Sequence, residues 1–191
     1  DYILKNCSFK MQSKKKYALV GVNGAGKSTI IKLITGMYND YSGKILLNGL
    51  DIKDYDYTML KGIISVVFQD FCKYETTVKD NIIVGRGFEY DQNEVNNIID
   101  KLELNELNEN LKNGLDTTIG KAIEEGVDLS GGQWQKLAIS RLLYSDAQIN
   151  ILDEPTAALD PIAEGNTYKL FDSVSDEKFV IYITHRLGAI K

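Results

Sequence analysis

The eight residues Gly21-Val22-Asn23-Gly24-Ala25-Gly26-Lys27-Ser28 decide the fold of this chain of 191 residues. A short apolar run, Tyr17–Val20, precedes them and is typical of a buried strand. After Lys27 the apolar residues recur at helical spacing, and Gly36 stands where such a helix would end. The pattern therefore predicts a strand, a glycine-rich loop and a helix in succession, with one helix face made by Ile30, Leu33, Ile34 and Met37.

This stretch matches the pattern G-x-x-x-x-G-K-[ST], and each part of the pattern serves phosphate binding. Glycines let the backbone curl until several N–H groups point at one anion, and the helix that follows adds the positive end of its dipole. Lys27 can reach the β- and γ-phosphates of a nucleotide, and Ser28 can offer its hydroxyl to Mg²⁺. We therefore expect residues 21–28, with the adjoining Thr29, to bind nucleotide phosphates. Kinases and GTPases share this loop, so it does not fix the class alone.

The composition is that of a soluble globular protein, with 43% hydrophobic and 26% charged residues. A net charge of −5 argues against coating duplex DNA, which needs a basic surface, but leaves nucleotide binding open because backbone N–H groups can hold phosphate. Cys7 and Cys72 fit neither a metal-ligand pair nor a disulfide framework, so we expect free thiols. No apolar run approaches the ~18 residues of a membrane span.

Further apolar runs alternate with helical patterns along the chain. Strands are expected at Lys44–Leu47, before a turn at Asn48-Gly49, and at Ile63–Phe68, Ile149–Leu152 and Phe179–Ile183. Helices are expected with one face made by Val95, Ile98, Ile99, Leu102 and Leu107, another from about Gly131 through Trp134, Leu137, Ala138 and Leu142, and a last one over about Ile162–Val174. This alternation predicts an α/β fold with a mostly parallel sheet.

The segment 70–146 is mostly helical and interrupts the alternation of strands and helices. We therefore assign it to an inserted α-helical subdomain. The chain as a whole is expected to form one domain, residues 1–191, with residues 1–69 and 147–191 as its nucleotide-binding core. A chain of this length buries roughly 70% of the surface that its unfolded form exposes, which is enough for a core.

A second group of candidate residues opens a helix at Leu129-Ser130-Gly131-Gly132-Gln133. Ser130 is a good N-cap, and the two glycines leave backbone N–H groups open to a phosphate. Capping alone does not explain two glycines, which helix starts seldom need. Because this helix start lies far in sequence from the phosphate loop, we interpret it as binding a nucleotide held by another subunit. That interpretation requires Ser130 to be at the surface.

Two adjacent carboxylates, Asp153 and Glu154, follow the expected strand Ile149–Leu152. An aspartate at the end of a buried strand organises Mg²⁺ through its water shell. Glu154 is then placed to accept a proton from an attacking water. The competing explanation for Glu154 is a carboxylate that favours the dipole of a following helix.

The chain's one histidine, His185, follows the expected strand Phe179–Ile183, and Gln69 follows Ile63–Phe68. Ligands of α/β sheets bind at the edge where strands end, so an imidazole there can hydrogen-bond a γ-phosphate. The competing explanation for His185 is a structural or surface role. The competing explanation for Gln69 is that it is merely a polar residue at an exposed strand end.

Together these pieces resemble the ATP-binding cassette (ABC) family in order and spacing. Residues 21–28 look like Walker A, Gln69 like the Q-loop, and 129–133 like the LSGGQ signature. Residues 149–153 look like Walker B with Glu154 as the catalytic glutamate, Ala158-Leu159-Asp160 resembles the D-loop, and His185 the switch histidine. The resemblance implies a P-loop NTPase (RecA-like) core, a small N-terminal antiparallel β part and the inserted helical subdomain.

The resemblance also implies a function: ATP hydrolysis that powers transport across a membrane, with ATP and Mg²⁺ as cofactors. Lys27, Glu154 and His185 would be catalytic, and Ser28, Gln69 and Asp153 would hold the metal. The family layout implies a head-to-tail dimer, with a second copy or a related nucleotide-binding domain, in which Ser130–Gln133 and Asp160 complete the partner's ATP site. It further implies transmembrane domains N-terminal in the same polypeptide, no nucleic-acid partner, and a place on the cytoplasmic face of the cell membrane.

Two segments favour the exporter branch of the family: Thr77–Ile82 after Gln69, and Glu124–Asp128 before the signature. The chain also departs from the family pattern. No aromatic residue far enough upstream of the phosphate loop is present to stack on adenine, and the chain stops six residues after His185. We therefore expect a domain cut at both ends. Asn150 interrupts the usually apolar Walker B strand.

Two alternatives remain open on the sequence alone. One is a soluble ABC ATPase that uses ATP as a switch on nucleic acid or ribosomes; the absence of a long coiled coil between phosphate loop and signature argues against its chromosome-maintenance relatives. The other is a catalytically idle binding module, which the presence of Lys27, Glu154 and His185 disfavours. The transported substrate is not readable from this chain.

Overall fold

The computed structural model describes residues 3–123, 126–154, 165 and 178–184, and it divides into two compact units. Unit 1 comprises the described parts of 1–66, 147–154 and 175–191, and unit 2 the described parts of 67–146 and 155–174. The α-helices are α1 (Lys27–Ile34), α2 (Tyr57–Ile63), α3 (Val78–Ile83), α4 (Gln92–Lys101), α5 (Asn105–Asn110) and α6 (Gly131–Tyr144). The strands are β1 (Lys16–Val20), β2 (Leu46–Leu47), β3 (Leu50–Asp51), β4 (Ile64–Val67), β5 (Ile149–Asp153) and β6 (Phe179–Thr184).

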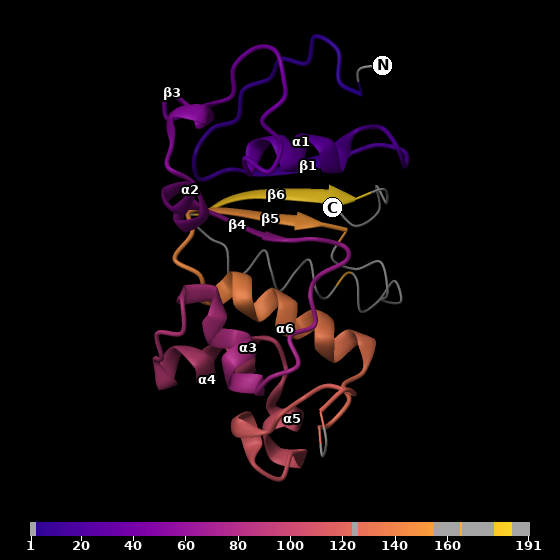
Figure 1. Cartoon of the computed structure of the whole chain (residues 1–191). Coiled ribbons are helices and arrows are strands. Elements are labelled where there is room, and N and C mark those ends of the chain that lie inside the picture. The colour runs from indigo at the N-terminus through magenta and orange to yellow at the C-terminus, as the bar shows by residue number, and fades with distance from the viewer. Residues whose placement is uncertain (1–2, 124–125, 155–164, 166–177, 185–191) are drawn as a thin grey trace. The chain divides into compact units, whose positions relative to one another are not determined.

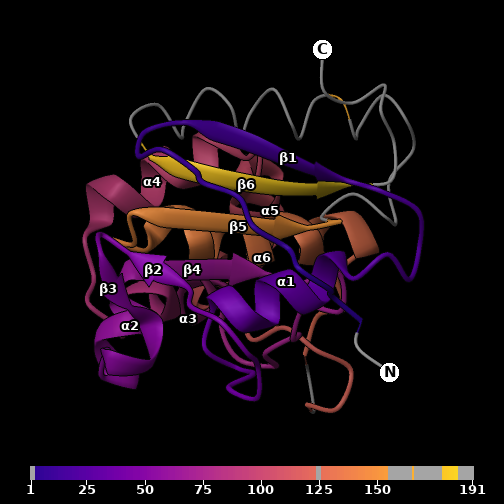
Figure 2. The ribbon, with the colours of Figure 1, turned by 90° about the horizontal axis from the view of Figure 1, so that it is seen from above.

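The main sheet has the strand order β1-β6-β5-β4, and Figure 2 shows its strands side by side. β1 and β5 each pair with β6 in parallel. In register, Val20 faces Thr184 and Asp153 faces Ile183, so the carboxyl ends of these three strands meet at one edge. β5 and β6 are almost wholly buried, as expected of central parallel strands. The predicted α/β fold with a mostly parallel sheet is confirmed.

A small antiparallel hairpin joins β2 and β3. Its two turn residues, Asn48 and Gly49, have φ angles of 53° and 88°. Two successive left-handed residues give the turn whose twist matches a two-residue hairpin, and Asn-Gly is the sequence that adopts it most readily. The structure therefore confirms the turn predicted at Asn48-Gly49 and the small antiparallel β part.

The helix after the phosphate loop is shorter than its apolar pattern predicted. α1 ends at Ile34 because Gly36 adopts a φ of 71°, which leaves the helical region. Met37, expected on the buried face, lies beyond this end and is 48% exposed, whereas Ile31 is fully buried at 0%. The assignment of Met37 to the core face was wrong, and Ile31 takes the central position.

The sequence analysis did not predict α2, whose last residue is Ile63. The strand predicted at Ile63–Phe68 is therefore β4, which starts one residue later and ends at Val67. Asp56 caps α2, since its carboxylate accepts hydrogen bonds from the N–H groups of Thr58 at 2.8 Å and Met59 at 3.4 Å. Of this short helix only Leu60 is buried, so it has no apolar periodicity to detect.

Unit 2 is built around α6, against which α3 and α4 pack (Figure 1). The residues predicted to form buried helix faces are buried: Val95, Ile98, Ile99, Leu102, Leu107, Trp134, Leu137, Ala138 and Leu142. The face predicted from Val95 to Leu107 is divided between α4 and α5, because the helical conformation ends at Glu103, whose φ is 51°. Cys7 and Cys72 are exposed free thiols, as predicted. Within the described ranges, no helix has the length and apolarity to span a membrane.

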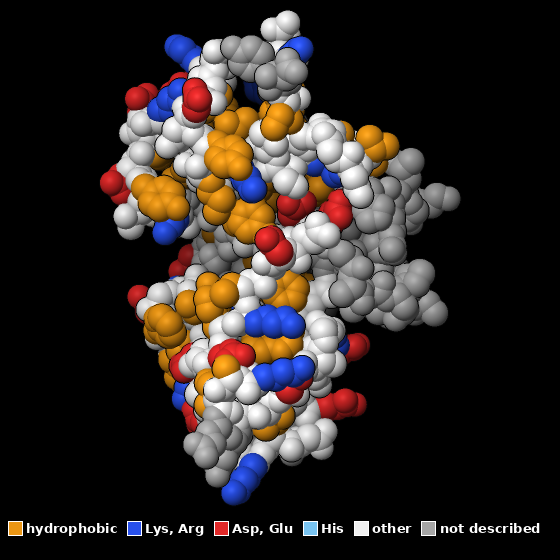
Figure 3. Space-filling view, turned by 45° about the vertical axis from the view of Figure 1, so that its right-hand side comes forward, with side chains coloured by type: hydrophobic (Ala, Val, Ile, Leu, Met, Phe, Trp, Pro, Cys, Tyr) orange, Lys and Arg blue, Asp and Glu red, His pale blue; other side chains and the backbone are white. Residues whose placement is uncertain are grey.

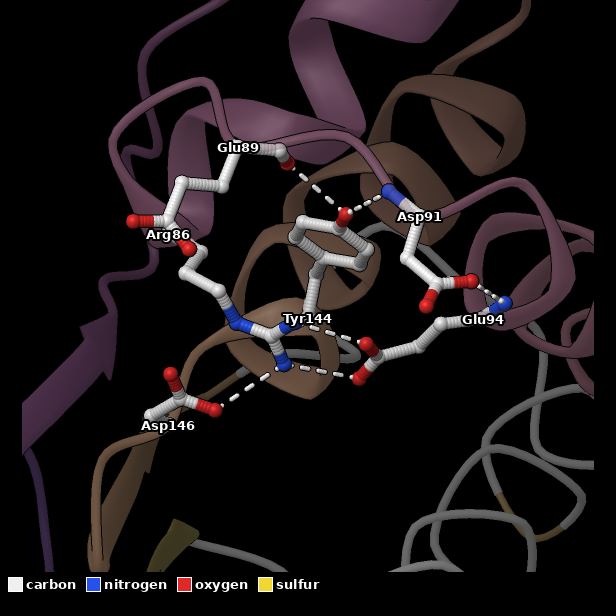
Figure 4. Close-up of polar contacts among 6 residues, drawn as sticks. All are labelled: Arg86, Glu89, Asp91, Glu94, Tyr144 and Asp146. Carbon is white, nitrogen blue, oxygen red and sulfur yellow. Dashed lines mark hydrogen bonds and ion pairs between the residues drawn. The ribbon is translucent and has the colours of Figure 1, made fainter.

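A brace of charged groups fixes the end of α6 inside unit 2 (Figure 4). The guanidinium of Arg86 makes two hydrogen bonds to Glu94, at 2.7 and 2.8 Å, and an ion pair of 2.9 Å with Asp146. The guanidinium carbon of Arg86 lies over the ring of Tyr144, 4.6 Å from the ring centroid. The hydrogen bond to Glu94 raises the pKa of the Arg86 guanidinium above its ordinary value. Lys and Arg side chains also lie on hydrophobic ones elsewhere at the surface (Figure 3).

Candidate functional site

The predicted phosphate loop lies in unit 1 between β1 and α1, as the sequence requires. Gly24 and Gly26 have φ angles of 80° and 88°, a region that residues with a Cβ rarely adopt. Gly26 is the N-cap of α1, and its carbonyl accepts the first helical hydrogen bond, from Ile30 N–H at 3.0 Å. The loop thus presents backbone N–H groups beside a helix N-terminus, which is the arrangement that binds phosphate.

Lys27 lies inside this loop and is only 8% exposed. Its ammonium donates hydrogen bonds to the carbonyl oxygens of Gly21, at 2.9 Å, and Val22, at 3.1 Å. It also lies 3.8 Å from a carboxylate oxygen of Glu154, whose side chain is 13% exposed. The positive charge of Lys27 is therefore held at the loop carbonyls, close to the carboxylate of Glu154, which the sequence analysis also predicted as a site residue.

The two carboxylates stand at the end of β5, at the edge where β1 also ends. Asp153 is buried, and Glu154 is partly buried. The backbone N–H of Glu154 donates to the carbonyl of Ile183 on β6 at 3.1 Å, which fixes the residue to the sheet. Glu154 has a φ of 46°, in the left-handed region, so its backbone carries strain of about 1–3 kcal/mol, a feature that clusters at active sites.

The oxygen donors at this edge fit a magnesium ion. Ser28 is exposed at the start of α1, and Asp153 closes β5. Mg²⁺ takes oxygen ligands, keeps several waters and is usually bound by one or two carboxylates together with substrate phosphates. No cluster of three or more metal-binding side chains occurs in the part of the chain that the structure describes, and a nucleotide-bound Mg²⁺ does not require one.

The remaining predicted site residues lie in unit 1, in unit 2 or outside the described residues. Gln69 lies in an exposed turn after β4, in unit 2. Thr29, next to Ser28 in α1, is half-buried. Asp160 and His185 lie outside the described residues, as do Ala158, Leu159 and, apart from Gly165, the helix predicted over 162–174.

The signature residues open α6, with Ser130 as the N-cap that the sequence predicted. The Ser130 hydroxyl accepts from the N–H of Gln133 at 3.2 Å, and the Gln133 side chain accepts from the N–H of Ser130 at 2.9 Å. This reciprocal capping box was not foreseen, although a serine followed three residues later by glutamine predicts it. Ser130 and Gly131 are exposed, and no atom of the described residues lies within 4 Å of the position of a Cβ on Gly131. The helix tip is therefore open to a ligand.

This fold and this loop together define a P-loop nucleotide-binding protein. The family model described as ABC transporter matches residues 4–157. The subtilin transport ATP-binding protein SpaT of Bacillus subtilis is 43% identical over 192 residues, which cover 100% of this chain and 31% of that protein. The mitochondrial iron-sulfur clusters transporter of Saccharomyces cerevisiae is 41% identical over 190 residues, covering 98% of this chain and 27% of its own length.

Among solved structures, a bacterial Atm1-family ABC exporter with ATP bound matches with a TM-score of 0.88 and 34% sequence identity, over 98% of this chain and 32% of that one. The chain belongs to the ABC transporter family, and within it to the ATP-binding, exporter-type domains. It spans about a third of the length of the relatives that it matches. The named relatives are transport proteins, which favours transport over the soluble switch.

Proposed function

We propose that this chain binds ATP with Mg²⁺ and hydrolyses it as the nucleotide-binding domain of an ABC exporter. The observation that carries the proposal is the position of Lys27, whose ammonium lies between the carbonyls of the phosphate loop and, at 3.8 Å, the carboxylate of Glu154. A phosphate-binding cation and a candidate base therefore share one edge of the sheet. A triphosphate bound by the loop would place its γ-phosphate beside both.

Each residue of this edge has a role in the proposal. Lys27 exchanges its loop carbonyls for the β- and γ-phosphate oxygens, and the N–H groups of Gly24–Ser28 hold the same phosphates. Glu154 accepts a proton from the attacking water. Ser28, Asp153 and Gln69 hold the Mg²⁺, which when bound neutralises charge on the phosphates. His185 hydrogen-bonds the γ-phosphate.

The proposed assembly is a head-to-tail dimer, with either a second copy or a related nucleotide-binding domain. The exposed tip at Ser130–Gly131 and the open approach to it support a contact in trans. In that dimer the segment Ser130–Gln133 and Asp160 of one subunit complete the ATP site of the other. Residues 1–69 and 147–191 form the ATP-binding core, and residues 70–146 carry the signature.

Partners in the membrane complete the proposal. Transmembrane domains, N-terminal in the same polypeptide, would move the substrate, and this domain would lie on the cytoplasmic face of the cell membrane. The support is that the named relatives are transporters about three to four times as long as this chain. No nucleic-acid partner is proposed.

The decisive experiment replaces Glu154 by glutamine. Glu154→Gln keeps the shape of the side chain but removes the base, and general-base catalysis contributes about 10²- to 10⁴-fold. We expect ATP turnover to fall by that factor while ATP binding persists and ATP-bound dimers accumulate. Glu106→Gln, which alters an exposed carboxylate of α5, is the matched control and should turn over ATP like the parent. Turnover by Glu154→Gln at the parental rate would reject Glu154 as the base.

A further inference from the structure

A clamp of two side chains in unit 2 holds the segment of residues 72–77, called here the strip. Arg141, on α6, donates one hydrogen bond to the carbonyl of Cys72 at 2.6 Å and another to the side-chain oxygen of Asn81 at 2.5 Å. The amide nitrogen of Asn81 donates in turn to the carbonyls of Tyr74 and Thr77, both at 2.9 Å. Arg141 and Asn81 thus bind three backbone carbonyls of the strip.

The inner part of the clamp is removed from solvent, whereas Cys72 and Tyr74 lie at the surface. Asn81 is fully buried, and burial lowers the pKa of Arg141. The ring of Tyr74 covers the guanidinium, whose central carbon lies 4.3 Å from the ring centroid. A planar fork that binds two oxygens and stacks on a ring is a task for arginine, and lysine cannot reproduce it.

Other contacts fix the strip along its length. The ammonium of Lys73 lies 5.8 Å from the ring centroid of Trp134, in the first turns of α6. On the other side, Ile119 N–H donates to the carbonyl of Thr76 at 2.9 Å, and Lys121 N–H donates to Glu75 at 3.2 Å. The strip is therefore held in contact with both α6 and residues 119–121.

The strip and α6 each adjoin a residue that is predicted to bind nucleotide. The strip begins three residues after Gln69, and α6 begins directly after Ser130. Arg141 lies eleven residues beyond Ser130, which is roughly 16 Å along a helix, so it is too far from the helix tip to touch a ligand bound there. The clamp connects the segment that carries Gln69 to the helix that carries the signature.

We propose that the clamp of Arg141 and Asn81 couples the two ATP sites of the dimer. This inference rests on the proposed function, in which each subunit gives Gln69 to its own ATP and Ser130–Gln133 to the ATP of its partner. When one bound nucleotide displaces Gln69, the strip and α6 transmit this displacement to Ser130–Gln133, which binds the other nucleotide. Arg141 is a positioning residue. Its effect is on cooperativity, since a coupling free energy between two sites changes the affinity of each site for ATP when the other is occupied.

The test is the Hill coefficient for ATP hydrolysis by the intact protein, for which two coupled sites allow a value of up to about 2. Arg141→Lys should lower this coefficient toward 1 while the protein still binds and hydrolyses ATP. Arg86→Lys is the matched control, because Arg86 also stacks on a tyrosine and makes a fork in unit 2 but does not contact the strip. It should destabilise the fold and leave the Hill coefficient unchanged.

Tyr74→Ala removes the ring that covers the guanidinium at a half-exposed position, so it keeps the test valid if Arg141→Lys does not fold. It should lower the Hill coefficient partway. Parental cooperativity in both variants would overturn the inference, as would a coefficient of 1 in the parent protein. An absence of ATP turnover in the parent would instead overturn the proposed function, so the two failures are distinguishable.

Discussion

Gly85 packs directly against the backbone of Arg141, so closely that a Cβ atom at residue 85 would overlap the Arg141 carbonyl oxygen. A backbone carbonyl inside a helix cannot move aside as a flexible side chain can. Gly85→Ala should therefore push the segment after α3 away from α6 and lower the free energy of unfolding by about 1–3 kcal/mol, the usual cost of overpacking. Urea unfolding measures the change.

The matched control for this prediction is Gly62→Ala in α2. In the part of the chain that the structure describes, no atom lies within 4 Å of a Cβ at residue 62. Alanine in place of glycine inside a helix should stabilise the protein by about 0.5–1 kcal/mol. A Gly85→Ala protein as stable as the parent would show that the two segments do not approach each other as closely as the structure has them.

Lys27→Ala should lose most of the affinity for ATP. The ammonium is already desolvated and held by Gly21 and Val22, so it is ready to bind phosphate without a further loss of hydration. A hydrogen bond to a charged group contributes about 1.5–3 kcal/mol, which predicts a loss of roughly 10- to 150-fold in affinity. A fluorescent-nucleotide titration measures it, with Lys32→Ala, in the same helix, as the control. Unchanged binding would reject the assignment of the phosphate loop.

The sequence predicted the parts of the fold that local chemistry determines. The φ angles of Gly24 and Gly26 require glycine, and the capping role of Ser130 needs only its own helix, so each leaves a mark in a few adjacent residues. Gly36 likewise marked the end of α1. The roles assigned to Gln69, Asp160 and His185 stay predictions.

The parts that sequence analysis missed depend on residues far apart in the chain. Arg141 and Cys72 are separated by 69 residues, and Arg86 and Asp146 by 60, so no local pattern pairs them. α2 was not predicted because a single buried leucine gives no apolar periodicity. Met37 was assigned to the wrong position because Gly36, two residues after the last residue of α1, ends the helix although the apolar spacing continues. Tertiary contacts decided the arginine pairings, whereas the end of α1 before Met37 was decided locally by Gly36.

Asn150→Val should stabilise the protein. Asn150 is fully buried in β5, and neither atom of its amide has a hydrogen-bond partner among the described residues. An unpaired buried amide costs about 1–3 kcal/mol, and valine suits a central strand. We expect the free energy of unfolding to rise by about that amount, measured by urea unfolding. Asn150→Asp should lower it, because a carboxylate is harder to bury. A destabilised Asn150→Val protein would mean that the amide makes a polar contact in solution.

Tyr144→Phe should destabilise unit 2 without altering its packing. The Tyr144 ring is fully buried beneath Arg86, and its hydroxyl accepts from the N–H of Asp91 and donates to the carbonyl of Glu89, both at 2.8 Å (Figure 4). Phenylalanine keeps the ring but removes two hydrogen bonds to part-buried backbone groups, each worth about 0.5–1.5 kcal/mol. The urea midpoint should fall while the slope of the transition is unchanged, since the slope reports the surface exposed on unfolding.

The control for Tyr144 is Tyr90→Phe, which removes a hydroxyl from a half-exposed tyrosine of the same segment. Water replaces the lost partner there, so the change should stay within about 0.5 kcal/mol. Equal effects of the two substitutions would show that the Tyr144 hydroxyl is solvated. In that case the turn before α4 is not fixed to the end of α6 by this hydroxyl, and the brace would consist of the Arg86 contacts alone.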